Sequence, residues 1–118
     1  MRRGEIWFAD TGSGGGDRPV LVLTRDPVAD RIDAVVVARL TTTIRGLSSE
    51  LRLGVADGLR RDCVVSFDNL HTVRRSAFRR RVGTLRPARL REACDVLADA
   101  LGCGDRPPRH PAGATVRA

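Results

Sequence analysis

The sequence predicts a mainly β domain with one C-terminal helix, folded as a small β-barrel or a strongly coiled sheet. Short apolar runs rich in β-branched residues alternate with turns that contain glycine or aspartate, as in all-β proteins. Only residues 87–101 repeat apolar side chains at helical spacing. The 118 residues suffice for one domain, and 42% apolar with 30% charged residues excludes a disordered or coiled-coil chain.

Three strands and one helical turn are expected in the N-terminal part. Residues 4–10 have an alternating apolar character and lead into a glycine-rich loop, residues 11–17, so they predict a strand. Residues 19–24 form a β-branched run too short for a helix, with a proline where a strand begins. The Asp-Pro pair that opens residues 26–30 favours one helical turn. The apolar run 32–40 predicts the central strand of the sheet.

Three further strands and the helix follow. Residues 50–53 alternate polar and apolar side chains, and residues 62–68 form an apolar run after an Asp-Gly turn. Residues 79–85 are the expected last strand, with basic side chains on its open face. The helix begins at Pro87, carries apolar residues at spacings of four, three and four, and ends before Gly102.

The expected domain spans residues 1–102, and residues 103–118 are expected to be a disordered tail. The tail contains three prolines and two glycines and almost no apolar side chains. No apolar run approaches the roughly 18 to 20 residues of a membrane helix, and the N-terminus does not resemble a secretory signal. We therefore expect a cytoplasmic protein without membrane contact.

Positive charge is concentrated in one short segment. The chain has 21 basic residues, all of them arginine, and 14 acidic residues, which gives a net charge of +7. Residues 74–91 contain eight arginines and no acidic residue, whereas the rest of the chain is nearly balanced. Because arginine binds phosphate through a planar fork of donors, nucleic acid is the first partner to consider. A solvated surface or an acidic protein partner is the alternative.

The chemistry available to the chain is narrow. Three cysteines without a C-x-x-C pair and only two histidines predict reduced thiols, no metal site and no cofactor. The motifs of metallohydrolases and serine hydrolases are missing from the sequence. Arginine beside hydroxyl-rich and glycine-rich loops suits a phosphodiester. In RNA the ribose 2′-hydroxyl can attack its own phosphorus, so such cleavage requires no metal.

Four segments resemble, in order and spacing, the MazF/PemK family of toxin endoribonucleases, the mRNA interferases of type II toxin–antitoxin systems. These segments are residues 4–10, 17–23, 35–41 and 62–72, within a resemblance that covers residues 2–102. The resemblance implies an SH3-like small β-barrel of the CcdB/MazF/PemK type that forms a homodimer. It also implies sequence-specific, metal-independent cleavage of single-stranded RNA to 2′,3′-cyclic phosphate and 5′-OH ends, and inhibition by a MazE-like antitoxin.

The resemblance also implies site residues. Arg18 is expected to contact the scissile phosphate, and Thr41 to support the phosphorane with its hydroxyl. Since a guanidinium is a poor base in water, charge stabilisation suits Arg18 better than proton transfer. The residues expected to bind RNA, by resemblance or by the charge pattern, are Asp17, Thr43, Arg45, Leu47, Phe67, Asp68, Asn69, Arg79, Arg80 and Arg81.

Each assignment has a structural alternative. Arg18 could pair with Asp17 or cap the loop, and Thr41 could be an ordinary hydroxyl at the end of a strand. Phe67 could stack on a base or belong to the core. His71, placed just past the recognition strand, is a possible acid–base group, although a structural role is preferred. Arg39 stands where the family more often has a small residue or proline, so it is expected to alter the strand end or the base preference.

Two rival functions remain at the level of the sequence. A gyrase poison of the CcdB type shares the barrel, but its C-terminal Trp-Gly-Ile signature is absent from the end of this chain, residues 115–118. A non-catalytic nucleic-acid-binding barrel would use the basic segment for salt-dependent affinity alone.

Overall fold

A computed structural model of the protein describes residues 1–26 and 28–103, which form six strands, one long helix and three short 3-10 turns. The strands are β1 (Glu5–Ala9), β2 (Arg18–Val22), β3 (Ala34–Thr41), β4 (Glu50–Leu53), β5 (Cys63–Arg74) and β6 (Phe78–Thr84). The turns are η1 (Val28–Asp30), η2 (Val55–Asp57) and η3 (Arg75–Ala77), and the helix is α1 (Pro87–Leu101). The predicted class, mainly β with a C-terminal helix, is confirmed.

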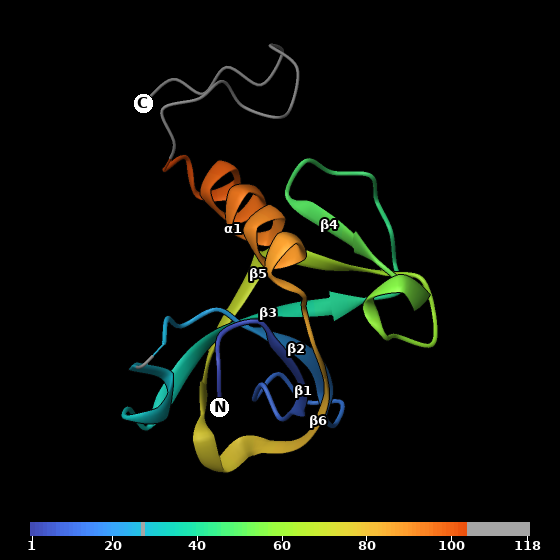
Figure 1. Cartoon of the computed structure of the whole chain (residues 1–118). Helices are drawn as coiled ribbons and strands as arrows, with labels where there is room; N and C mark the ends of the chain where they lie inside the picture. Colours follow the sequence, from blue (N-terminus) through green and yellow to red (C-terminus); the bar gives the residue numbers. More distant parts are fainter. Residues whose placement is uncertain (27, 104–118) are drawn as a thin grey trace.

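All six strands form one antiparallel sheet in the order β4-β5-β3-β2-β1-β6 (Figure 1). β3 lies inside the sheet between β2 and β5, as its long apolar run predicts. The pairing of β3 with β5 contains a register shift: Ala38 pairs with Leu70, whereas Arg39 pairs with Ser66. Such an irregularity bends a strand and increases its local twist.

Strand β5 is longer than the sequence predicts. The expected strand ends at Asp68, but the pairing with β3 continues to Arg74. Polar residues interrupt the apolar pattern after Asp68, yet residues 70–74 still pair with β3. His71 therefore lies within the strand, opposite Val37, and the prediction that it follows the strand is wrong.

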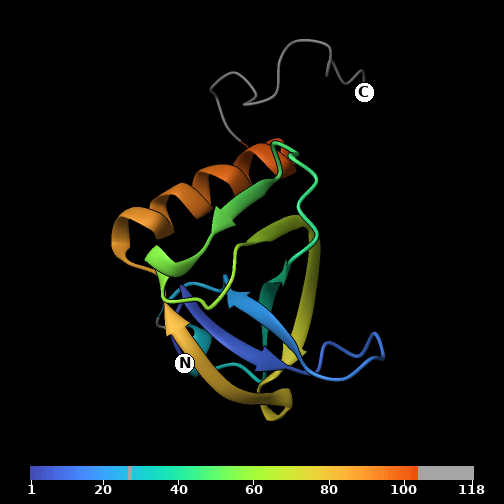
Figure 2. The ribbon, with the colours of Figure 1, turned by 90° about the vertical axis from the view of Figure 1, so that its right-hand side faces the viewer.

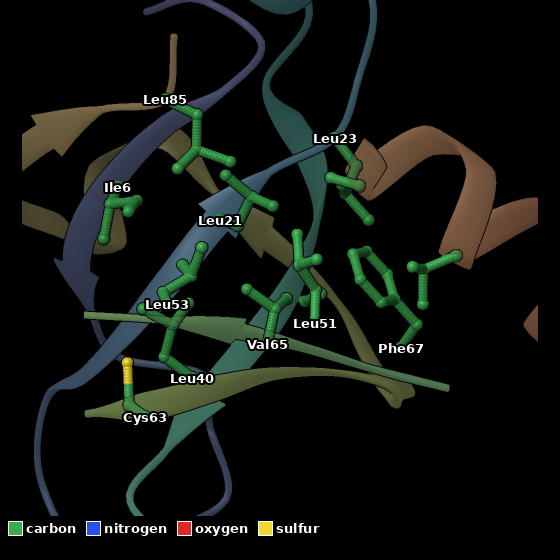
Figure 3. Packing of buried hydrophobic residues seen from close by; sticks show 13 residues of the cluster. Ile6, Leu21, Leu23, Leu40, Leu51, Leu53, Cys63, Val65, Phe67 and Leu85 are labelled. Carbon is green, nitrogen blue, oxygen red and sulfur yellow. The ribbon is translucent and has the colours of Figure 1, made fainter. Parts of the chain in front are cut away.

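Apolar residues bury both faces of the central strands. On β2, Leu21 belongs to one core cluster, while Val20 and Val22 belong to the other. Figure 3 shows the first cluster, in which leucines from several strands converge with Phe67. Burial on both faces explains why β2 and β3 read as nearly continuous apolar runs. Each fully buried side chain of this size contributes roughly 1.5 to 3 kcal/mol of transfer free energy.

Helix α1 covers the first core cluster and contacts β4 and β5 (Figure 2). It begins at Pro87 and ends at Leu101, before Gly102, whose φ of +71° is left-handed and favours glycine, as predicted. Its inner side is set by Ala93 and Val96, which are buried, whereas Leu101 is 55% exposed. The buried side of the helix is therefore centred on Ala93 and Val96, and not on all the apolar residues of the predicted four-three-four spacing.

No helix in the described part of the chain has the length and apolar character needed to cross a membrane. The predicted tail lies outside the described residues, apart from Cys103.

Candidate active site

Two adjoining hollows open where β2 begins and β3 ends. The larger one, the major hollow, has a volume of about 610 Å³, and the smaller one, the minor hollow, about 310 Å³. Arg39 and Thr41 line both. The two cavities therefore meet at these two residues.

The lining of the major hollow combines apolar and cationic side chains and contains no acidic residue. Its apolar members are Phe8, Pro19, Leu40, Leu59, Cys63 and Val82. Its arginines are Arg18, Arg39, Arg60, Arg61 and Arg80, and its hydroxyl residues are Thr41 and Thr42. Such a surface suits a ligand that joins an apolar ring to an anion.

The pairing of β2 with β3 accounts for the approach of Arg18 to Thr41. Val20 pairs with Arg39 in the antiparallel ladder, and continuing this register by two residues brings Arg18 level with Thr41. Because side chains alternate along a strand, Arg18, Arg39 and Thr41 belong to the same face. The sheet thus brings together the two residues that the resemblance implies as a catalytic pair.

Two arginines at the site each have a buried Nε donor without a hydrogen-bond partner. The Nε atoms of Arg18 and Arg39 are inaccessible to solvent and form no hydrogen bond among the described residues. Gly15, in the glycine-rich loop, has a φ of +80°, and a Cβ there would lie 2.7 Å from Nη2 of Arg18. The loop backbone therefore closes on Arg18, which a side chain at Gly15 would displace. Arg18 does not pair with Asp17, whose ion-pair partner is Arg79.

The basic segment is divided between the site and ion pairs. Arg80 lines the major hollow and lies over the Phe8 ring, 4.9 Å from its centroid. Arg79 pairs with Asp17 at 3.7 Å, and Arg81 pairs with Glu5 at 3.2 Å. These three arginines are thus not a common unopposed stripe, since acids from distant parts of the chain meet two of them.

Glu5 is almost fully buried beside this edge of the sheet. Burial raises the pKa of its carboxyl, but hydrogen bonds from the Trp7 indole, the Arg2 N–H and Arg81 outweigh it and hold the pKa below its ordinary value. Glu5 therefore remains ionised and fixes Arg81 away from both hollows.

The minor hollow is rich in hydrogen-bond acceptors. Its other lining residues are Thr43, Arg45, Leu47, Glu50, Ser66, Asp68 and Asn69. Oε1 of Glu50 accepts the N–H groups of Arg45 at 3.1 Å, Gly46 at 2.9 Å and Leu47 at 3.3 Å, which holds the loop in place. Ser49 donates to Oδ2 of Asp68. Oγ1 of Thr41 accepts the N–H of Thr43 at 3.1 Å.

Besides Arg79 and Arg81, three further predicted residues lie outside the hollows for identifiable reasons. Phe67 is 1% exposed in the core, so the prediction that its ring stacks on a base is wrong and its alternative, a core residue, is confirmed. His71 lines neither hollow, and its Nε2 lies 2.8 Å from Oδ1 of Asn69. Asp17 also lines neither hollow, because it faces Arg79.

The loop between β4 and β5 supplies site residues that the sequence analysis missed. Arg60 and Arg61 line the major hollow, and this loop lies at the end of β3 (Figure 1). Its start is held by Asp57, which accepts from Nε of Arg89 on α1 at 2.9 Å. The adjacent arginines were a signal in the sequence, but nothing local related them to residues 18 and 41.

The thiol of Cys63 also lines the major hollow and is nearly buried. Burial, together with the carboxylates of Asp57 and Asp62, raises the pKa of this thiol. Cys63 is therefore protonated near neutral pH and is a poor nucleophile. Among residues 1–26 and 28–103, no group of three or more His, Cys, Asp or Glu side chains could hold a metal ion.

Comparisons with known proteins identify the family. The family model of the PemK-like, MazF-like toxins of type II toxin–antitoxin systems matches residues 2–101. A curated protein of Mycobacterium tuberculosis, "Probable endoribonuclease MazF2", is 65% identical over 104 residues, which are 87% of this chain and 100% of that protein.

Solved structures agree with this match. The M. tuberculosis toxin MazF-mt6 superimposes with a TM-score of 0.77 at 32% identity, over 85% of this chain and 98% of that chain. A mycobacterial endoribonuclease in complex with its cognate antitoxin gives a TM-score of 0.79 at 29% identity, over 88% and 97% of the two chains. The chain therefore belongs to the PemK-like, MazF-like toxins of type II toxin–antitoxin systems, as its residues predict.

Proposed function

We propose that this MazF-family toxin endoribonuclease cleaves single-stranded RNA, sequence-specifically and without a metal, where the major and minor hollows meet. One observation supports this most strongly: Arg18 and Thr41 line the same hollow, in which arginines are abundant and acidic residues are missing. A phosphodiester is the anion that such a surface attracts. We assign Arg18 and Thr41 as the catalytic pair.

The protein contributes no nucleophile in this reaction, because the ribose 2′-hydroxyl attacks the neighbouring phosphorus. A bond forms between the 2′-oxygen and phosphorus, and the bond to the 5′-oxygen breaks. The 2′-hydroxyl loses a proton and the leaving 5′-oxygen gains one. The products carry 2′,3′-cyclic phosphate and 5′-OH ends.

Charge accumulates on the phosphorane oxygens during the attack. The Arg18 guanidinium would stabilise this charge, since preorganised donors act most strongly where charge develops. The Thr41 hydroxyl accepts the Thr43 N–H, which orients it, and its own hydrogen can be donated to a phosphorane oxygen. A guanidinium is a poor base in water, so we assign Arg18 a role through its charge.

The minor hollow would read the bases next to the cleaved bond. Asp68, Asn69 and Glu50 present oxygen acceptors, and Asn69 also has an amide donor, which suits the edges of unpaired bases. The Phe8 ring in the major hollow offers an apolar surface for a base. Because the two hollows share Arg39 and Thr41, successive nucleotides could occupy them with the connecting phosphate between.

The partners follow from the family and the charge. A structural relative is solved in complex with its cognate antitoxin, and we propose that a MazE-like antitoxin with an acidic segment covers the arginines of the major hollow. We further propose a cytoplasmic homodimer without a cofactor. Light scattering on the purified protein, alone and with the antitoxin, would measure both assemblies.

The decisive experiment incubates the protein in EDTA with a long unstructured RNA and with single-stranded DNA, beside Arg18→Ala and the matched variant Arg31→Ala. Arg31 is exposed and lines neither hollow. We expect discrete RNA fragments with cyclic-phosphate ends from the wild type and Arg31→Ala only, and intact DNA. RNA that is bound but uncleaved by the wild type would reduce the function to nucleic-acid binding. Cleavage that Arg18→Ala retains would remove Arg18 from the mechanism.

A further inference from the structure

Arg39 occupies the junction of the two hollows without a structural partner. It lines both cavities together with Thr41, and its Nε is buried without a hydrogen bond among the described residues. The described part of the chain shows no ion pair to its guanidinium. Buried donors are normally satisfied by protein, water or a ligand, and a guanidinium that lines both cavities without an ion pair is available to an anionic ligand.

Arg39 lies on the sheet face that carries the second core cluster, but it does not belong to that cluster. Its chain neighbours Ala38 and Leu40 are buried in the first core cluster, whereas Arg39 is half-buried on the opposite face. It pairs with Val20 on one side and with Ser66 on the other, and neither can neutralise a guanidinium. The register that aligns Val20 with Arg39 also places Arg18 diagonally across from it, on the same face.

Neither carboxylate of the minor hollow forms an ion pair with Arg39, and one oxygen of each has another partner. Oε1 of Glu50 accepts three N–H groups of the loop, and Oδ2 of Asp68 accepts from Ser49. An arginine retained to balance these acids would be expected to pair with one of them. Arg39 instead remains beside Arg18, a second cation, which an anion held between the two guanidinium groups would stabilise.

We propose that Arg39 is a second phosphate-binding arginine, which grips the scissile phosphodiester from the side of the minor hollow while Arg18 holds it from the major hollow. This inference rests on the proposed function. Two guanidinium forks on one phosphate would fix its orientation for attack by the 2′-hydroxyl. Arg39 would therefore contribute to catalysis as well as to binding, at a position distinct from the Arg18 and Thr41 pair.

The test is a double-mutant cycle between protein and substrate. Arg39→Met retains the length of an unbranched side chain but removes the charge, and Arg39→Lys retains the charge but removes the fork. Arg31→Met is the matched control. The cleavage site of the wild type is first mapped on a short RNA. The substrate is then made uncleavable by a 2′-deoxy sugar at that site, with a neutral methylphosphonate either at the scissile linkage or two linkages away.

We expect Arg39→Met to lower kcat/KM about 10- to 100-fold, the range for loss of a hydrogen bond to a charged group. It should also weaken binding to the uncleavable RNA and reduce the slope of log K against log salt by about 0.7. On the scissile methylphosphonate this loss of affinity should disappear, whereas on the distant one it should persist. Arg39→Lys should recover the salt slope but only part of kcat, and Arg31→Met should match the wild type.

Two results would overturn the inference. If Arg39→Met and the scissile methylphosphonate lower affinity independently, Arg39 does not contact that phosphate, although the proposed function stands. If Arg39→Met cleaves as fast as Arg31→Met, the residue has no part in catalysis. If the wild type cleaves no RNA, the proposed function fails first, and the inference about Arg39 fails with it. Thermal unfolding of each variant checks that the fold is intact.

Discussion

Arg89 of α1 donates from Nε to Oδ1 of Asp57 at 2.9 Å, and this ion pair joins the helix to the start of the loop that carries Arg60 and Arg61. The Asp57 side chain is only 5% exposed. Arg89 also donates to the backbone carbonyl of Arg52 in β4. One guanidinium therefore connects a helix, a strand and the wall of the major hollow, although it lines neither hollow itself.

Replacing Arg89 by methionine should lower the free energy of unfolding by about 2 to 3 kcal/mol, because the nearly buried Asp57 carboxylate would lose its cation. Urea denaturation followed by circular dichroism measures this loss. Arg31→Met, which removes an exposed arginine, should stay within about 0.5 kcal/mol of the wild type. Equal stabilities of the two variants would contradict the assigned role of the ion pair.

The same pair predicts how stability responds to acid. Burial raises the pKa of Asp57, but the hydrogen bonds from Arg89 and from the Gly54 N–H outweigh it, so the pKa lies below 3.8. The stabilisation is therefore complete above about pH 4 and is lost as the pH falls through the lower pKa of the folded state. In Arg89→Met burial would act with less opposition, so the fall in urea midpoint between about pH 5 and pH 2 should shrink. Parallel curves for the two proteins would argue against this linkage.

Two adjacent glycines offer a matched test of the loop that closes on Arg18. Gly15→Ala places a Cβ 2.7 Å from Arg18 Nη2, whereas Gly14→Ala meets no atom within 4 Å. Both residues have φ near +80°, so both substitutions carry the same backbone strain. We expect Gly15→Ala to lower kcat at least about 10-fold through displacement of Arg18, and Gly14→Ala to have a much smaller effect. Similar rates for the two variants would show that the contact does not position Arg18.

The arginines of β6 should contribute unequally to RNA binding, because their environments differ. Arg80 lines the major hollow, while Arg79 faces Asp17. Arg80→Gln should weaken RNA binding and reduce the salt slope by about 0.7, the value for one phosphate contact on a single strand. Arg79→Gln should change the slope less, because its charge is already partly balanced. Binding titrations from low to high salt decide between this view and a uniform basic stripe, for which the two changes would be equal.

Phe67 should affect stability and leave base recognition unchanged. Truncation of this fully buried ring to alanine is expected to cost roughly 3 to 5 kcal/mol. The milder Phe67→Leu variant should fold and cleave RNA at the same sequence as the wild type, since the ring does not reach either hollow. A changed cleavage motif in folded Phe67→Leu would restore the ring as a recognition element.

Much of the fold could be predicted from the sequence because the signals are local. The apolar runs of β2 and β3 and the helix limits at Pro87 and Gly102 depend on neighbouring residues and on backbone preference. The end of β5 could not be predicted this way. Its last residues are held by hydrogen bonds to β3, which polar side chains do not prevent.

The candidate site likewise has features that the sequence predicts and features that only the fold decides. The sequence, through its resemblance to the family, predicted that Arg18 and Thr41 act together, and its charge pattern made nucleic acid the first partner to consider. Only the tertiary structure decided which arginines line the hollows. Arg79 and Arg81 meet acids from the first strand and its loop, whereas Arg39 and Arg60 remain in the hollows. These pairings join residues more than 60 positions apart, so they depend on how the sheet curves, which no local stretch of sequence encodes.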